Sequence, residues 1–295
     1  MAIDINRGTA GLMELPAEVS QDIWAQTLEN SVVQRLARKI ELPAGGLQIE
    51  TVLTEPEAGW VGETDEKPVS NHTFGSKIIA PYKVALIELF SDEFRRDKAA
   101  LYEQLVQRLP GALGRKFDRT VFGHDAAPGD NFDTLADAPE VALTGSHEGY
   151  VNALTSVAAA GGDLSHWVLS PTAEIGALND VDAAGKPLFL PDVQADGTIG
   201  SIYARPAVKS RAVAEGTTVG IAGDWSQAVW GSVEGIKIKF SDQATITKGA
   251  DHINLWQRNM FAVLVEAELG FRVADVNRFA KLTQAAADGD EGTEG

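Results

Sequence analysis

The stretch AGWVGETDEKPVSNHTF (residues 58–74) decides the fold, together with the segments on either side of it. Before it, apolar and polar residues alternate, which is typical of a strand with one buried face. After it, a second alternating run continues through Ile78, Ile79, Lys83 and Ala85 to Phe90. The sequence therefore predicts a long β-hairpin. Its outgoing strand carries Leu47, Ile49, Thr51 and Leu53, and its tip spans residues 55–72.

This hairpin has no evident partner nearby in the sequence. A two-stranded hairpin is at best marginally stable alone in water, and its open edges need to be covered or paired. The next segment is a helix and not a third strand. We therefore expect the hairpin to complete its packing on another subunit, which predicts a protein that assembles.

A long amphipathic helix follows the hairpin, from Asp97 to Phe122. An unbroken helix of this length would extend about 39 Å at ~1.5 Å per residue. Pro110 lies inside it and removes a backbone donor, so we expect a bend near Leu109. The apolar residues recur every four positions: Leu101, Leu105, Leu109, Leu113, Phe117 and Val121.

Composition limits the function. The 295 residues are 44% hydrophobic, enough for a packed core. There is no uncharged apolar run of about 18 residues and no signal-peptide pattern, so we expect neither a membrane span nor export. With no cysteine, disulfides and thiolate metal sites are excluded. The five histidines lack metal-ligand spacing, and neither a metal nor a cofactor is expected.

The chain is strongly acidic, with a net charge of −17 from 25 basic and 42 acidic residues. This charge opposes non-specific attraction to phosphate backbones, which argues against a DNA-recognition module. Two interpretations of the charge stay open. Either the function of the protein does not need a strongly basic surface, or the charge simply keeps the protein soluble.

The remaining segments predict an α+β fold in several parts. Residues 1–43 form an N-terminal arm with a helical pattern that ends at Leu42-Pro43, and residues 44–90 form the extended loop. Residues 91–144 and 225–284 are expected to form one discontinuous domain, with an α/β lobe of residues 145–224 inserted in it. Residues 285–295 are small and acidic and predict disorder.

Three stretches carry a family resemblance. They are the loop motif GWVGE followed by KPVSNHTF, then WVLSPTAEIGALNDVDAAGKPLF (residues 167–189) and GDWSQAVW (residues 223–230). In these stretches and in their order along the chain, the sequence resembles the major capsid proteins of tailed bacteriophages of the Hong Kong 97 type. The resemblance covers nearly the whole chain and implies an N-terminal arm, an extended loop, a peripheral domain with a spine helix, and an axial domain.

The resemblance implies a structural protein and not an enzyme. Its copies would form hexamers and pentamers of an icosahedral virion shell around double-stranded DNA, assembled in the host cytoplasm without a membrane. A portal and a scaffolding protein are implied as partners, with a maturation protease or a decoration protein as further candidates. The arm is not preceded by a long charged coiled coil, which implies that scaffolding comes from a separate protein or that the segment was removed.

Some family members join subunits through an isopeptide bond between a loop lysine that precedes a proline and an asparagine, helped by a glutamate seven residues further on. The resemblance assigns these roles to Lys67, Asn259 and Glu266, with Glu268 as a competing helper. The lysine must react as a neutral amine, and an acid of raised pKa must accept its proton. On a strand, Asn259 and Glu266 would lie about 23 Å apart, so different subunits would supply the three groups. In a helix, the separation would be only about 10 Å.

The same three residues are also compatible with simpler roles. Lys67 stands among Glu63, Asp65 and Glu66 and is equally consistent with a solvated loop charge, and Asn259 and Glu266 with ordinary surface polarity. The residue types alone therefore leave the crosslink open.

Three different classes of protein compete with the capsid protein. An encapsulin-like nanocompartment that encloses an enzyme shares the fold. An α/β enzyme would need a convergent acid, base or nucleophile, and none is evident beyond the proposed trio. A surface adhesin stiffened by isopeptide bonds lacks both an export signal and an all-β pattern.

Overall fold

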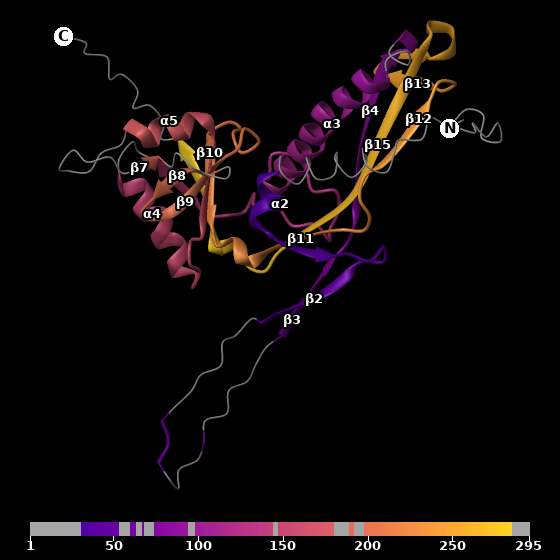
Figure 1. Ribbon diagram of the computed structural model, residues 1–295. Coiled ribbons are helices and arrows are strands. Elements are labelled where there is room, and N and C mark those ends of the chain that lie inside the picture. The colour runs from indigo at the N-terminus through magenta and orange to yellow at the C-terminus, as the bar shows by residue number, and fades with distance from the viewer. Residues whose placement is uncertain are drawn as a thin grey trace, which may run out of the picture.

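The computed structural model describes residues 31–52, 60–62, 67, 74–93, 98–143, 147–179, 189–191 and 198–284. Most of the arm, most of the loop tip and the acidic tail lie outside these residues, so the predictions made for them stay predictions. The described chain forms two bodies, each built around one β-sheet, with a hairpin that projects from the first body (Figure 1).

Strand β15 (Met260–Val273) is the central strand of the five-stranded sheet. Along one edge it pairs antiparallel with β4 (Tyr82–Ser91), from Met260 opposite Ser91 to Leu269 opposite Tyr82. Its other edge pairs with β12 (Lys237–Ser241) and then with β11 (Ala228–Ser232). Apolar residues alternate along this strand, and Phe261, Val263 and Val265 are fully buried.

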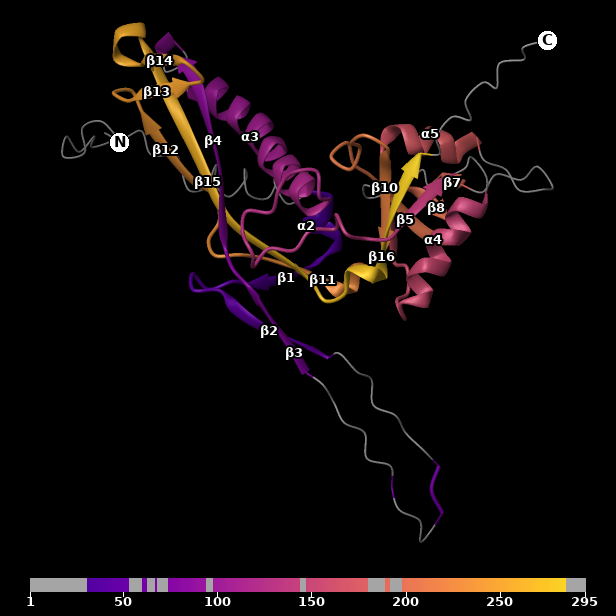
Figure 2. The same ribbon diagram turned by 180° about the vertical axis from the view of Figure 1, so that it is seen from behind.

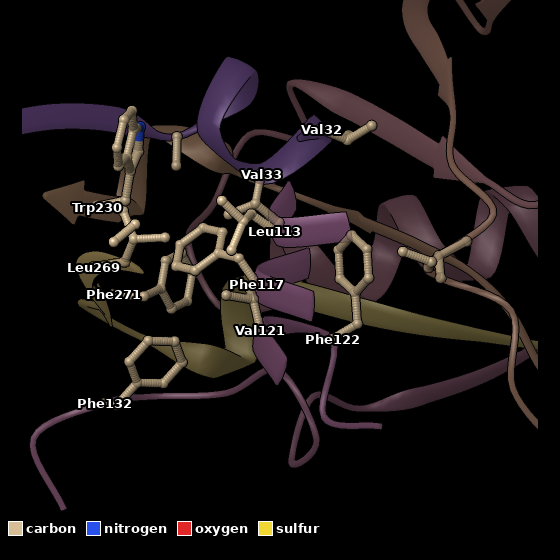
Figure 3. Close-up of a cluster of buried hydrophobic side chains, with 14 of the residues drawn as sticks. Val32, Val33, Leu113, Phe117, Val121, Phe122, Phe132, Trp230, Leu269 and Phe271 are labelled. Atoms are coloured by element: carbon tan, nitrogen blue, oxygen red, sulfur yellow. The ribbon is translucent and has the colours of Figure 1, made fainter. Parts of the chain in front are cut away.

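Helix α3 (Lys98–Val121) covers this sheet, and its bounds differ by one residue at each end from the predicted helix. It continues through position 110, so the proline does not end it. Its residues Leu113, Phe117 and Val121 point into the core (Figure 3). There Phe117 makes edge contacts with Phe132 and Phe271, at ring centroid distances of 6.1 and 6.3 Å.

The second body has a seven-stranded sheet with α4 (His147–Ala159) and α5 (Pro171–Asn179) packed on it. Ser170 caps α5 by accepting a 3.1 Å hydrogen bond from the Ala173 N–H, as Ser170-Pro171 predicts. The strands, in spatial order, are β5 (Glu140–Leu143), β16 (Phe279–Gln284), β10 (Thr218–Gly223), β6 (His166–Leu169), β9 (Arg205–Lys209), β8 (Thr198–Ile202) and β7 (Phe189–Pro191).

Two strands of this sheet come from outside residues 145–224. Strand β16 pairs antiparallel with β10, and β5 pairs parallel with β16 (Figure 2). The sequence grouped both segments with the long helix, and here the structure differs. The physical reason is that an apolar strand satisfies its backbone in either sheet, and only the tertiary pairing decides which one. Phe279 of β16 packs edge-on against Trp225, so the two bodies share core contacts.

The arm enters through α2 (Val32–Leu36) and β1 (Arg38–Glu41). The helical pattern expected up to Leu42-Pro43 is therefore wrong for residues 38–41. Strand β1 pairs parallel with β11, with Arg38 opposite Val229, and this long-range ladder overrides the local spacing. Leu42 is buried just after the strand.

The hairpin consists of β2 (Leu47–Val52) and β3 (Phe74–Ile79), paired antiparallel from Leu47 opposite Ile79 to Val52 opposite Phe74. It projects away from both sheets (Figures 1 and 2). The expected continuous return strand to Phe90 breaks at Ala80-Pro81, because proline cannot donate to a ladder. Strand β3 stays in the hairpin, and β4 joins the five-stranded sheet. A smaller hairpin, β13 (Thr245–Lys248) and β14 (Asp251–Asn254), lies near the far end of β15.

Candidate functional site

The base of the projecting hairpin is tied to one end of β15. The Lys77 ammonium donates a 2.7 Å hydrogen bond to the Val273 carbonyl, and the Arg272 guanidinium donates one of 2.7 Å to the Ile78 carbonyl. Asp133 joins the same cluster, accepting from the Val273 N–H at 3.0 Å and from Arg272. These contacts fix where the hairpin leaves the body.

The described residues of the loop tip are solvent-exposed. These four residues are Trp60, Val61, Gly62 and Lys67. The Lys67 amine is therefore accessible to a group on another molecule.

Asn259 lies at the opposite end of β15, directly before Met260. It ends a short 3₁₀ turn, η3 (Trp256–Arg258), in the left-handed conformation with φ 51° and ψ 52°. Asparagine tolerates this conformation better than most residues. The Asn259 carbonyl accepts a 2.9 Å hydrogen bond from the Asp92 N–H, so the backbone is held while the side chain is exposed.

Glu266 lies in the middle of β15, between cations on both neighbouring strands. Its carboxylate is 3.3 Å from Nζ of Lys239 on β12 and 3.6 Å from Nζ of Lys83 on β4. The hydrogen bond from Lys239 is the main reason that the pKa of Glu266 lies below its usual range, and Lys83 adds to the effect. Within one subunit, Glu266 is thus an ion-pair partner, whereas the proposed helper requires a raised pKa. Glu268 lies 4.0 Å from the same Lys83.

The structure does not bring Lys67, Asn259 and Glu266 together in one subunit. Because residues 260–273 are a strand, the extended spacing applies, and Asn259 and Glu266 are separated by about 23 Å at ~3.3 Å per residue. The hairpin that carries Lys67 is tied to the far end of the same strand. Any reaction between these groups therefore needs more than one copy of the chain.

A residue that the sequence analysis missed is Asp118, on α3 and fully buried. It accepts hydrogen bonds from the Ser31 hydroxyl at 2.6 Å and from the N–H groups of Val32 and Val33 at 3.0 and 3.3 Å. Burial nevertheless raises its pKa to about 7. One feature of the sequence could have indicated this residue. Asp118 lies three residues before Val121 and so falls on the apolar face of the helix.

Within the described residues, no group of three or more histidine and acidic side chains is placed to hold a metal ion. The helices seen in that part of the chain are also too short or too polar to cross a membrane. The candidate site is therefore a pair of exposed surfaces, one at the loop tip and one at the turn before β15.

Comparisons with known proteins agree with this arrangement. The model of the phage capsid family matches residues 13–284. The chain is 34% identical to the protein named "Probable major capsid protein gp17" of Mycobacterium phage L5, over 92% of this chain and 90% of the relative. A solved structure from Gordonia phage Cozz shares the fold, with a TM-score of 0.67, 23% identity and coverage of 87% of each chain.

A capsid subunit of an empty GTA particle also shares the fold at 14% identity, with a TM-score of 0.63 over 87% of this chain and 90% of that one. The match to the family model spans both bodies and the projecting hairpin. The fold is accordingly that of Hong Kong 97-like capsid subunits. The chain belongs to the phage capsid family, as a major capsid protein of the virion.

Proposed function

We propose that copies of this chain form hexamers and pentamers that close into an icosahedral shell around double-stranded DNA. The observation that carries the proposal is the hairpin β2–β3, which is firmly tied at its base and projects from the body. A closed shell needs repeated contacts between unlike surfaces of identical subunits. A projecting hairpin on one copy and an exposed surface on the next supply such a contact.

The shell would act with other proteins. A portal and a scaffolding protein are the partners that the family suggests, with a maturation protease or a decoration protein in addition. The net charge of −17 supports a shell that encloses DNA without holding it tightly. An encapsulin-like compartment is not favoured, because the relatives are phage capsid proteins. Nuclease-resistant DNA inside purified particles is expected, and a co-purifying enzyme in its place would contradict this content.

We further propose that assembled subunits become joined by an isopeptide bond. The neutral amine of Lys67 attacks the side-chain amide carbon of Asn259 on another subunit. The new C–N bond replaces the bond to the Asn259 amide nitrogen, which leaves as ammonia. The proton lost by the lysine passes through a carboxylate to the departing nitrogen, so atoms and charge balance.

Glu266 is the proposed carboxylate, and its ion pairs set a condition. While Lys239 and Lys83 hold it, its lowered pKa disfavours proton uptake. Contact with a neighbouring subunit must therefore displace Lys239 and Lys83, or exclude water from their ion pairs with Glu266, before the Glu266 carboxylate can accept a proton. Glu268, at 4.0 Å from Lys83, is the competing helper.

The test is a denaturing gel of assembled particles after boiling in detergent. We expect a ladder of covalent oligomers from the natural chain and only monomer from particles of the Lys67→Arg and Asn259→Asp variants. Glu266→Gln should slow ladder formation and Glu268→Gln should not, and the reverse result would assign the helper role to Glu268. A ladder that persists in Lys67→Arg particles, or monomer alone from natural particles, contradicts the crosslink.

A further inference from the structure

We propose that the Trp60 side chain at the loop tip of one subunit docks on the turn that carries Trp256 in a second copy of this chain. This inference rests on the proposed assembly into a shell. It adds a non-covalent recognition step that precedes the bond between Lys67 and Asn259 and does not depend on it.

The turn that carries Trp256 is held by hydrogen bonds and by a buried neighbouring side chain. Its side chain is 72% exposed, while the preceding Leu255 is completely buried and anchors the turn. The Leu255 N–H donates to the Ala244 carbonyl, and the Leu255 carbonyl accepts from the Met260 N–H, both at 3.1 Å. A side chain of Asn254 caps the turn through the Gln257 N–H at 3.1 Å. A large indole held outward by such a frame loses little conformational freedom when it is covered.

Among the tryptophans that the structure describes, Trp60 is strongly exposed as well. Its side chain is fully exposed, and the neighbouring Val61 is 42% exposed. Tryptophan is enriched among the residues that contribute most to interface affinity, because it buries a large apolar area at a small cost in side-chain entropy. Both indoles are therefore suited to a contact between proteins.

The two indoles cannot meet within one chain. Lys77 and Ile78 of the hairpin are tied to Val273 and Arg272, at the end of β15. Trp256 precedes the start of the same strand, whose 14 residues span about 46 Å at ~3.3 Å each. The hairpin also runs away from the end of the molecule where β13 and β14 lie (Figure 1). A contact between the two indoles therefore needs a second copy of the chain.

Charge and spacing favour the same pairing. The exposed turn carries Arg258, and the sequence of the loop carries Glu63, Asp65 and Glu66. Trp60 precedes Lys67 by seven residues, and Trp256 precedes Asn259 by three. Docking of the indoles would therefore hold the amine near the amide and raise its effective concentration there.

The absence of cysteine allows a direct test. In a Lys67→Arg background, which removes the isopeptide bond, Val61→Cys and Gln257→Cys are combined, so that both indoles stay in place, and assembled shells are treated with a short bis-maleimide. The matched control combines Val61→Cys with Ile175→Cys, because Ile175 is 61% exposed on α5 of the other body. We expect reagent-dependent oligomers at least ~10 times more abundant for the first pair. Equal yields from the two pairs would overturn the docking.

An alanine cycle covers the case in which the cysteine variants assemble poorly. In the same background, Trp60→Ala and Trp256→Ala should each raise the subunit concentration needed for shell formation by about tenfold. The double variant should need no higher concentration than either single variant, because both changes remove the same contact. If the two increases multiply in the double variant, or if neither single variant changes the concentration, the docking is overturned. Electron microscopy of the Lys67→Arg particles reports separately on assembly: if that parent forms no closed shells, the proposed function fails by itself.

Discussion

The hydroxyl of Ser31 donates a 2.6 Å hydrogen bond to Oδ1 of Asp118, although 87 positions separate the two residues. Ser31 caps the short helix α2 through the Gln34 N–H, and Asp118 accepts from the next two backbone donors, Val32 and Val33. A carboxylate of the long helix α3 thus completes the N-terminus of α2. The arm is joined to the main helix at this point.

Removal of this carboxylate should loosen the arm. Asp118→Ala leaves the hydroxyl and two buried N–H groups without their acceptor, so we expect a loss of about 2–4 kcal/mol in the free energy of unfolding. Asp118→Asn keeps one acceptor oxygen and should cost less. Urea unfolding followed by tryptophan fluorescence measures both. Asp137→Ala, at an exposed position, is the control, and an equal loss in that variant would contradict the assigned role.

The same carboxyl predicts a pH dependence. Burial is the main cause of the rise in the pKa of Asp118 from 3.8 to about 7, and it outweighs the hydrogen bonds and the charge of Arg35. The folded chain keeps this proton to a higher pH than the unfolded chain does. Its contribution to stability is therefore fully present below about pH 4 and is lost as the pH rises through about 7. Urea midpoints across this range should fall for the natural chain, and Asp118→Asn should remove part of that slope.

The anchor at the base of the hairpin should control hairpin mobility. The Arg272 side chain is only 11% exposed and pairs with Asp133, which also accepts from the Val273 N–H. Asp133→Ala should cost about 2–3 kcal/mol, because it leaves a largely buried guanidinium without its carboxylate. Hydrogen exchange at β3 amides should accelerate. Lys237→Ala breaks an ion pair between exposed groups and should change stability by less than about 0.5 kcal/mol.

Glycine at position 270 permits a close approach between β15 and the segment that joins β3 to β4. A Cβ there would lie 2.7 Å from the Ala80 carbonyl oxygen, so Gly270→Ala should cost about 1–3 kcal/mol. Gly176 in α5 has open space around the same position, and Gly176→Ala should stabilise the chain by about 0.5–1 kcal/mol. Thermal unfolding of the two variants compares them directly, and shifts in the same direction would contradict this packing.

The long periodic elements could be predicted from the sequence. The four-residue apolar spacing of α3 and the alternation in β15 extend over many residues and mark their own buried faces. Strand β1 could not be predicted, because four residues carry little pattern and their partner β11 lies far along the chain. The pairing of β16 with β10 likewise depends on tertiary contacts, whereas Pro81 was a local signal for the break between β3 and β4.

The candidate site was only partly predictable. The resemblance pointed to Lys67, Asn259 and Glu266. The sequence left open whether Asn259 and Glu266 are separated by the length of a strand or of a helix, and strand β15 decides for the larger separation. The ion pairs of Glu266 with Lys83 and Lys239 could not be seen, since they arise from the register of β4 and β12 on either side of β15. The exposure of Trp256 could not be predicted either, because a tryptophan close to apolar strands is expected to be buried in the core.

The most direct measurement is a single-particle reconstruction of shells assembled from the Lys67→Arg variant, in which no covalent bond can pull subunits together. We expect a closed shell in which residues 60–67 of each subunit lie against residues 256–259 of a neighbour. A closed shell with each hairpin folded onto its own subunit, or onto a neighbour's α5, would contradict it.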